Sequence, residues 1–305
     1  MPNKVILLDV SVMSFKAAFQ AELAAKYKRD AGFVLPAHYT YFSSIIACLK
    51  KINVSHDDIV ILCVDDKSWR KNFSFDYKAQ RKEAREKHAI NWDEHFSQVN
   101  RINQQIDNAT DFHVLQISNC EADDICSVAT RVFKDKEVII ASIDSDLQQL
   151  CYYPNVRFFN LNFKTPKGKG GYIKVTPDDA LKILDKKCRK GDVSDNIIVY
   201  PNEDEEDAKL RRTLVDLLHL PEDIELAITE VLQNLPVKER RGELPFPASL
   251  GKRFSDIYDP QYKVEYDYCL KLQEKRIIKK KKKEVTKRLL KKENKNESDS
   301  TNKIG

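Results

Sequence analysis

The sequence predicts an α/β protein with a doubly wound, mostly parallel sheet, a helical arch and a smaller helical C-terminal region. The first observation is three short apolar runs, each ending in aspartate, at 4–9, 59–65 and 137–146. Such runs predict parallel strands covered on both faces. The second is that helical patterns, at 11–29 and 38–52 among others, alternate with these strands, as is typical of such a sheet.

The remaining elements follow in chain order. Residues 66–110 are polar, basic and aromatic, and we expect helices there. After this segment we expect a strand at 112–116 and a helix that begins at EADD, from 121. A candidate strand at 156–161 and a Gly/Lys loop at 164–171 follow. Further helices are expected from Thr176, at 205–219 and at 221–234. This predicts a core over 1–190, a helical region over 191–274 and a basic tail over 275–305.

Composition narrows the class of protein. Hydrophobic residues make up 42% of the 305 residues, which is enough for a core, and no apolar run approaches the roughly 18 residues of a membrane span. The seven cysteines are scattered without a CxxC pair, and the six histidines are isolated. We therefore expect a reduced, cytoplasmic protein without an export signal, a membrane segment or a zinc site.

Glycine and proline are absent between residues 37 and 153. A phosphate-binding P-loop or a dinucleotide-binding GxGxxG turn needs glycines after an early strand. Neither motif can be present in this part of the chain. The sequence therefore disfavours a protein that binds a nucleotide cofactor through this core.

Charge is unevenly distributed along the chain. The whole chain carries +5, whereas residues 275–305 alone hold thirteen Lys and Arg against four Asp and Glu, or +9. The tail includes the run Lys279, Lys280 and Lys281, which predicts salt-dependent attraction to DNA. A solubilising tail is the alternative.

Carboxylates gather where strands end. Because the carboxyl ends of parallel strands meet at one edge of a sheet, these side chains should lie close together. The set comprises Asp9, Asp65, Glu121, Asp123, Asp124, Asp144, Asp146, Asp192 and Asp195. Crowded carboxylates repel one another unless cations bind them, and Mg²⁺ prefers oxygen ligands. The alternative is that each acid only caps a helix.

Basic residues of the expected arch would share a face if that segment were one helix. At 100° per residue, five cations fall within a narrow sector, which suits a phosphate backbone: Lys67, Arg70, Lys78, Arg81 and Arg85. Phe73, Phe75 and Tyr77 are interleaved with them and could stack on unpaired bases, or could belong to the core.

Five segments in this order resemble the 5′-nuclease superfamily, which includes flap endonucleases and the 5′-exonuclease domains of bacterial polymerases. They are LLDVSVMSFKAAF, CVDDKSWRKNFSFDYKAQRK, EADDICSVA, SIDSDLQQL and KGDVSDNI. The resemblance covers about 1–200 well and the remainder weakly. EADD, DSD and GDxSDN occurring together are specific, whereas each one alone is a weak signal.

The resemblance implies two Mg²⁺ sites, with Mn²⁺ as a substitute. The first would use Asp9, Asp65, Glu121, Asp123 and Asp144, and the second Asp124, Asp146, Asp192 and Asp195. It also implies that Arg70 and Lys78 engage the scissile phosphate and act in catalysis. DNA contacts are expected from Lys67, Tyr77, Arg81, Arg85, Lys279, Lys280 and Lys281.

One departure from the family pattern follows GDVSDN. Relatives continue with a proline- and glycine-rich hairpin that holds a potassium ion on the duplex, but this chain reads IIVYPNEDEED. The resemblance therefore gives no support for a potassium site here.

The resemblance implies a two-metal 5′→3′ exonuclease and flap endonuclease acting on DNA and RNA–DNA duplexes with a free 5′ end. It would remove RNA primers of lagging-strand fragments in phage DNA replication, as a monomer in the host bacterial cytoplasm, with a single-stranded-DNA-binding protein as partner. The alternatives are a PIN-type ribonuclease, disfavoured by the basic arch and GDxSDN, and a non-catalytic DNA-binding replication accessory protein, disfavoured by the complete carboxylate set.

Overall fold

A six-stranded sheet organises the computed structural model, which describes residues 4–26, 37–55, 57–74, 76–162 and 171–238. The strand order is β3-β2-β1-β4-β5-β6, and every pairing is parallel except that of β5 with β6. The strands are β1 (Val5–Asp9), β2 (Ile59–Val64), β3 (His113–Gln116), β4 (Val138–Ser142), β5 (Val156–Asn160) and β6 (Gly171–Ile173). The doubly wound, mostly parallel α/β fold predicted from the sequence is confirmed.

The chain reverses its direction of winding at β1. It first adds β2 and β3 on one side of β1 and then adds β4 and β5 on the other. Asp9 lies opposite Cys63 of β2, and Leu8 lies opposite Ala141 of β4. The carboxyl ends of the three central strands therefore meet at the switch point, where open α/β sheets bind their ligands.

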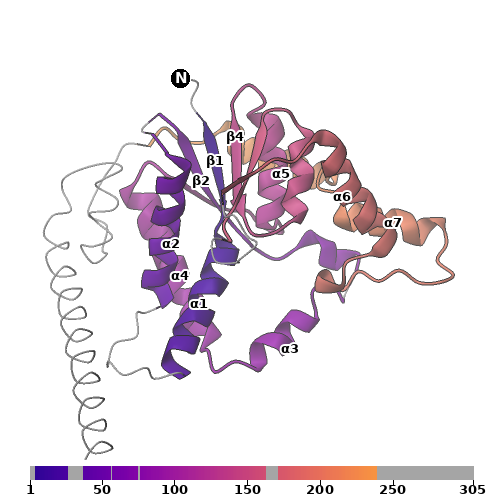
Figure 1. The fold of residues 1–305 in the computed structure, drawn as a ribbon, viewed down its shortest axis with the longest axis horizontal. Helices are drawn as coiled ribbons and strands as arrows, with labels where there is room; N and C mark the ends of the chain where they lie inside the picture. The colour runs from indigo at the N-terminus through magenta and orange to yellow at the C-terminus, as the bar shows by residue number, and fades with distance from the viewer. Residues whose placement is uncertain (1–3, 27–36, 56, 75, 163–170, 239–305) are drawn as a thin grey trace, which may run out of the picture. The chain divides into compact units, whose positions relative to one another are not determined.

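Helices cover both faces of the sheet (Figure 1). One layer contains α1 (Val10–Lys26), α2 (Ala37–Ile52) and α4 (Trp92–Ala109), and the other contains α5 (Ala122–Val132) and α6 (Pro177–Lys190). All five β1 residues are buried. Val5 and Leu7 join the core beneath α5, so Ile6 and Leu8 face the opposite layer, because side chains alternate along a strand.

Two further helices pack outside this frame. α7 (Glu205–Val215) contacts α6, and α8 (Glu222–Gln233) contacts α5. Leu214, Ile224 and Ile228 are buried in the same core cluster as the sheet. The helices predicted near 205–219 and 221–234 are thus present, although both end earlier than predicted.

The single helix needed to align all five arch cations does not form. The segment instead contains a 3₁₀ turn, η1 (Trp69–Asn72), a turn and a short helix, α3 (Gln80–Glu86), before α4 begins. Ser68 caps η1, and Arg70 and Tyr77 are buried, which holds the segment against the core. α3 buries none of its residues and lies apart from the sheet layers in Figure 1.

The strand β6 is absent from the sequence prediction, which placed a Gly/Lys loop over 164–171. Three residues are too few to show a strand period, so the antiparallel pairing with β5 alone defines it. Residues 163–170 and the predicted basic tail lie outside the described residues. Among the helices that are described, none has the length and apolar character required to cross a membrane.

Candidate active site

Four carboxylates from four elements form the four-acid cluster at the switch point. Asp9 ends β1, Asp65 follows β2, Asp123 lies in the first turn of α5 and Asp144 follows β4. Local hydrogen bonds orient them: Ser142 Oγ donates to Asp9 Oδ2 at 2.7 Å, and the Ala122 N–H donates to Asp65 Oδ1 at 2.8 Å. The structure thus brings four of the nine predicted acids together.

Burial and mutual repulsion both act on the four-acid cluster. Burial raises the pKa of Asp9, and the negative charges of Asp65 and Asp144 raise it further, to about 7. Burial and the charges of Asp144 and Asp9 raise the pKa of Asp123 well above its usual value. Within the described residues, no Lys, Arg or His forms an ion pair with any of the four. The cluster therefore favours bound cations, and its oxygen donors suit a hard divalent ion.

A second group of acids is already neutralised by the chain itself. Glu121 accepts from Arg70 Nη1 at 2.9 Å, from Tyr77 Oη at 3.0 Å and from Lys78 Nζ at 2.6 Å. Burial alone would raise the pKa of Glu121, but the positive charges of Lys78 and Arg70 outweigh it and lower the pKa to about 2.

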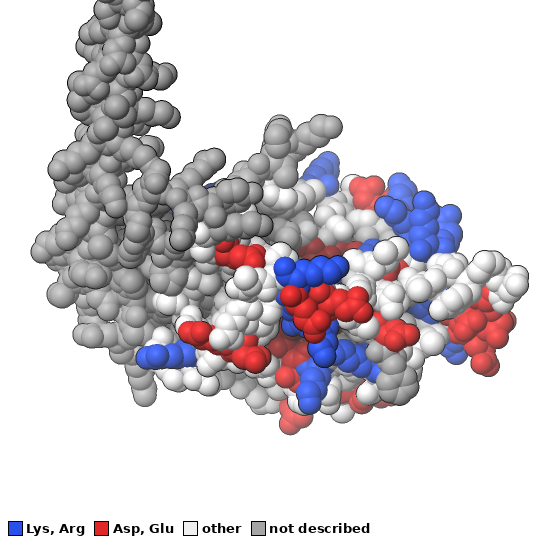
Figure 2. Space-filling view, turned by 90° about the horizontal axis from the view of Figure 1, so that it is seen from below, with Lys and Arg blue, Asp and Glu red and all other residues white. Residues whose placement is uncertain are grey.

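The other two members of this second group share the same cations. Asp124 is fully buried and pairs with Arg70 Nη2 at 2.9 Å, while Asp195 accepts from Arg81 and from Tyr77 Oη. Figure 2 shows acidic and basic side chains intermixed on the face of the described residues that is seen from below.

A third group joins the acids that follow β4 and α6. Lys187 Nζ lies 2.7 Å from Asp146 Oδ2 and also contacts Asp192 Oδ2. Asp192 caps the short turn η3 (Val193–Asp195) by accepting from the Ser194 N–H at 2.8 Å. Asp192 therefore acts as a helix cap, as the alternative interpretation of the acids predicted, and is at the same time paired with Lys187.

The nine predicted metal ligands do not form two ready-made sites. In the described part of the chain, no group of three or more His, Cys, Asp or Glu side chains is arranged to hold a metal ion. Glu121, Asp124 and Asp195 face arch cations and Asp146 and Asp192 face Lys187, because ion pairing relieves the same repulsion that a metal would. The chemistry of the four-acid cluster fits a divalent cation, but its side chains would have to move closer together.

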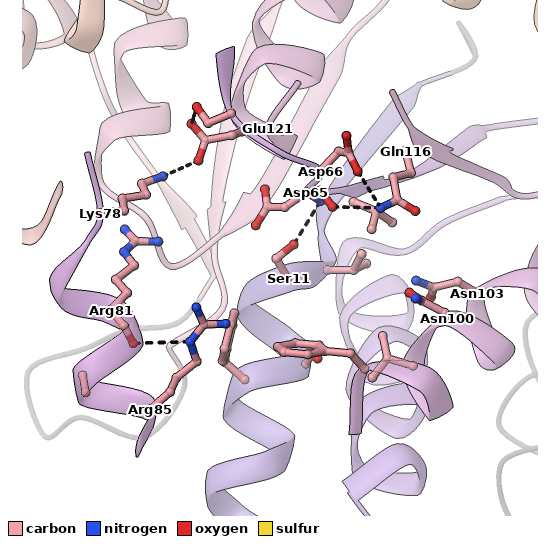
Figure 3. Close-up of a pocket in the computed structure, with 18 of the residues that line it drawn as sticks. Ser11, Asp65, Asp66, Lys78, Arg81, Arg85, Asn100, Asn103, Gln116 and Glu121 are labelled. Carbon is pink, nitrogen blue, oxygen red and sulfur yellow. Dashed lines mark hydrogen bonds and ion pairs between the residues drawn. The ribbon is translucent and has the colours of Figure 1, made fainter. Parts of the chain in front are cut away.

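A cavity of about 570 Å³ opens beside these groups, between the arch and the α1/α4 layer. Figure 3 shows Lys78, Arg81 and Arg85 on one side of it, Asn100 and Asn103 on the other, and Asp65 and Glu121 between them. Phe15, Phe19 and Phe96 also line it. Cations, aromatic rings and amides in one cavity can bind phosphates and bases.

The predicted DNA-contact residues of the arch separate into two classes. Arg81 and Arg85 line the cavity, whereas Lys67 is exposed and is not one of the lining residues among those described. Tyr77 is buried with its hydroxyl bonded to Glu121, as the core interpretation of the aromatics predicted, while Phe73 is exposed. Lys279, Lys280 and Lys281 lie outside the described residues.

Several site residues were missed by the motif analysis. Lys187 lies outside every acidic motif, and its spacing of five residues from Asp192 was the available signal. Ser142 and Ser68, which donate to Asp9 and Glu121, lie within two of the quoted motif segments, but only the acids and cations of those segments were singled out.

Known proteins resemble this chain in sequence and in fold. A family model described as "5′-3′ exonuclease, N-terminal resolvase-like domain" matches residues 4–184. The Ribonuclease H of Enterobacteria phage T4 is 28% identical over 199 residues, which is 63% of this chain and 62% of the length of that relative. The T5 D15 protein, co-crystallised with metal ions, superposes with a TM-score of 0.55 at 16% identity, covering 77% of this chain and all of that one.

These matches extend the evidence beyond the acidic motifs. The family model covers more than half of the chain and contains the whole sheet and four of the five predicted motifs. The solved T5 structure shares the fold. The match to the T4 Ribonuclease H agrees with the superfamily resemblance carried by the five motif segments. On these grounds the chain belongs to the 5′–3′ exonuclease family of the 5′-nuclease superfamily.

Proposed function

We propose that this protein is a divalent-metal-dependent 5′-nuclease, acting as a 5′→3′ exonuclease and flap endonuclease on DNA and RNA–DNA duplexes. The observation that carries the proposal is the four-acid cluster. Its carboxylates form no salt bridge with a Lys, Arg or His of the described residues, and it adjoins a cavity lined by arch cations. The name of the T4 relative, Ribonuclease H, supports an RNA–DNA substrate, and the metal ions of the T5 D15 crystals support metal dependence.

Each part of the site has a distinct role in this proposal. Asp9, Asp65, Asp123 and Asp144 would hold the divalent metal, which when bound supplies Lewis-acid stabilisation of phosphate oxygens and an activated water. Lys78 would offset the charge that develops on the phosphate in the transition state. Arg81 and Arg85 would hold the backbone of the strand that enters the cavity.

The biological role follows from the same substrate class. We infer that the protein removes RNA primers from lagging-strand fragments during phage DNA replication, with Mg²⁺ as the physiological ion. A single-stranded-DNA-binding protein is the partner that this role calls for. Product analysis on nicked, flapped and RNA-primed duplexes carrying a 5′ label distinguishes exonuclease from flap cleavage and measures the preference for RNA.

The Asp144→Asn variant tests the site directly. We expect cleavage to fall by about 100-fold or more, because one charge that holds the metal and stabilises the transition state is lost. DNA affinity measured by fluorescence anisotropy in EDTA should remain within a few-fold of wild type.

The matched control for this variant is Asp66→Asn. Asp66 adjoins Asp65, but its carboxylate accepts from the Asn119 N–H and the Gln116 amide, and its charge is not among the causes of the raised pKa values of Asp9 and Asp123. Its cleavage rate should stay near that of wild type. Full activity of Asp144→Asn at ordinary Mg²⁺ concentrations would refute the proposed active site.

A further inference from the structure

Lys187 connects two carboxylates that the chain brings together from distant elements. Asp146 begins the turn η2 (Asp146–Tyr152), Asp192 begins η3, and α6, which carries Lys187, packs against η2. The ammonium lies 2.7 Å from Asp146 Oδ2 and contacts Asp192 Oδ2, and all three side chains are largely buried. A lysine held by two carboxylates in this way is a fixed positive charge at that position.

The same position also adjoins the four-acid cluster. The Asp146 N–H donates to Asp144 Oδ1 at 2.8 Å, so one backbone link joins the two groups. Two carboxylates against one ammonium leave a net negative charge. In the described part of the chain, Asp146 Oδ1 is a buried oxygen that lacks a hydrogen-bond partner. The position therefore has a net negative charge and one free carboxylate oxygen, Asp146 Oδ1, both of which favour a further cation.

We propose that Lys187 is a built-in competitor at the second metal position of this nuclease. One divalent ion binds tightly at the four-acid cluster, and a second binds between Asp146 and Asp192 only by displacing the Lys187 ammonium. This inference rests on the proposed function. It means that the second metal ion binds only when the Lys187 ammonium has moved away from the two aspartates. Lys187 acts through the two aspartates and is a positioning residue.

The competition follows from ligand charge. Affinity of an oxygen site for a divalent cation depends on the charge of its ligands and on the rigidity of the site. With Lys187 in place the position carries a single net negative charge, and a metal ion must first break two ion pairs. Removing the ammonium restores the second negative charge and frees Asp146 Oδ2 and Asp192 Oδ2.

The test measures Mn²⁺ binding to the full chain without DNA, by calorimetry and by the electron paramagnetic resonance of free Mn²⁺. Wild type should bind one ion tightly and a second at least tenfold more weakly. Lys187→Met, which keeps the side-chain length and removes the charge, should tighten the second binding by about 10-fold or more, because the competing positive charge is gone. Lys187→Arg, which keeps the positive charge, should bind the second ion as weakly as wild type does.

The control is Lys186→Met, which makes the same charge change at an exposed neighbouring position of α6 and should leave both affinities unchanged. Should Lys187→Met not fold, Lys187→Gln carries the same expectation. The inference would be overturned if wild type had two equally tight sites, or if the second affinity were the same in wild type and Lys187→Met. The proposed function would still stand in either case, provided that wild type binds metal and cleaves DNA. A wild type that neither binds Mn²⁺ nor cleaves DNA would overturn both.

Discussion

Arg70 and Lys78 both pair with Glu121, but their remaining contacts give them different roles. Arg70 is 2% exposed, also pairs with Asp124, and donates from Nε to the Leu214 carbonyl at 2.9 Å. Lys78 lines the cavity, and its other carboxylate partner, Asp195, lies on a surface turn. The contacts of Arg70 are therefore those of a structural anchor, whereas Lys78 is positioned to meet a substrate.

We predict that Arg70→Ala mainly destabilises the fold and that Lys78→Ala mainly slows turnover. Loss of Arg70 leaves the buried Asp124 charge unpaired, which typically costs about 3–5 kcal/mol. Loss of Lys78 removes one transition-state interaction, which typically costs about 10²–10³ in rate. Urea unfolding and single-turnover cleavage of a 5′-overhang duplex measure the two effects.

Arg85→Ala serves as the stability control for Arg70→Ala. Arg85 lines the cavity, and the one hydrogen bond that its side chain makes within the described residues goes from Nε to the Arg81 carbonyl. Loss of this side chain should therefore change stability by less than about 1 kcal/mol. A Lys78→Ala rate within threefold of wild type would refute the assignment of Lys78. An Arg70→Ala protein as stable as wild type would refute the anchoring role.

At the scale of elements, the base of the arch is fastened to the loop that contains GDVSDN. Gln80 Nε2 donates to the Val193 and Ser194 carbonyls at 3.0 Å each, and the Lys78 N–H donates to the Asp195 carbonyl at 3.0 Å. Lys78 adopts φ of 56°, a left-handed conformation that is uncommon outside glycine. The surrounding contacts hold Lys78 in this strained backbone, as is common at functional sites.

Releasing this connection should loosen α3 without unfolding the protein. We predict that Gln80→Ala increases trypsin cleavage within residues 81–87 several-fold, because it removes two hydrogen bonds between the elements. The melting temperature should change by only a few degrees. Glu83→Ala, an exposed position of the same helix, should leave the cleavage rate unchanged. Equal cleavage of Gln80→Ala and wild type would show that these bonds do not hold the arch.

At the scale of the whole molecule, buried acids make stability depend on pH. In the metal-free protein, burial and neighbouring charges raise the pKa of Asp9 to about 7 and that of Asp146 to about 6, from an ordinary 3.8. The folded state then holds protons that the unfolded state has lost, so stability falls as pH rises towards 7. The depressed pKa of Glu121 has the opposite effect, confined to pH below about 4.5.

We therefore predict that the melting temperature in EDTA falls from pH 5 to pH 8. The loss is of the order of 1.4 kcal/mol for each unit of pKa difference. Asp9→Asn should flatten this dependence, because the neutral side chain does not titrate. Added Mg²⁺ should raise the melting temperature more at pH 8 than at pH 5. A profile that is the same for Asp9→Asn and wild type would contradict the role given to Asp9.

The basic tail is the other feature at this scale. We predict that replacing Lys279, Lys280 and Lys281 by Gln leaves the melting temperature unchanged and weakens DNA binding. The slope of log affinity against log salt should become shallower by about 0.9 for each phosphate that the protein no longer neutralises. Affinities at several salt concentrations measure the slope. A slope equal to that of wild type would exclude these lysines from the DNA-binding surface.

The amino-acid sequence by itself determined the frame of the protein and the place of its acids. Strand runs such as VILLD show their burial in a local pattern, and Asp9, Asp65 and Asp144 are fixed at the same sheet edge once those strands are parallel. These features follow from neighbours in the chain and from the geometry of parallel strands. The motif order in addition identified the superfamily.

Only the tertiary structure decided which carboxylate pairs with which Lys or Arg side chain. Arg70 meets Glu121 across 51 residues of sequence and Arg81 meets Asp195 across 114, and no periodicity encodes such pairings. The same interactions break the expected arch helix, because burial of Arg70 and Tyr77 outweighs local helix propensity. Which carboxylates remain without a cation therefore depends on distances in the folded chain, since electrostatic energy depends on spatial separation and burial.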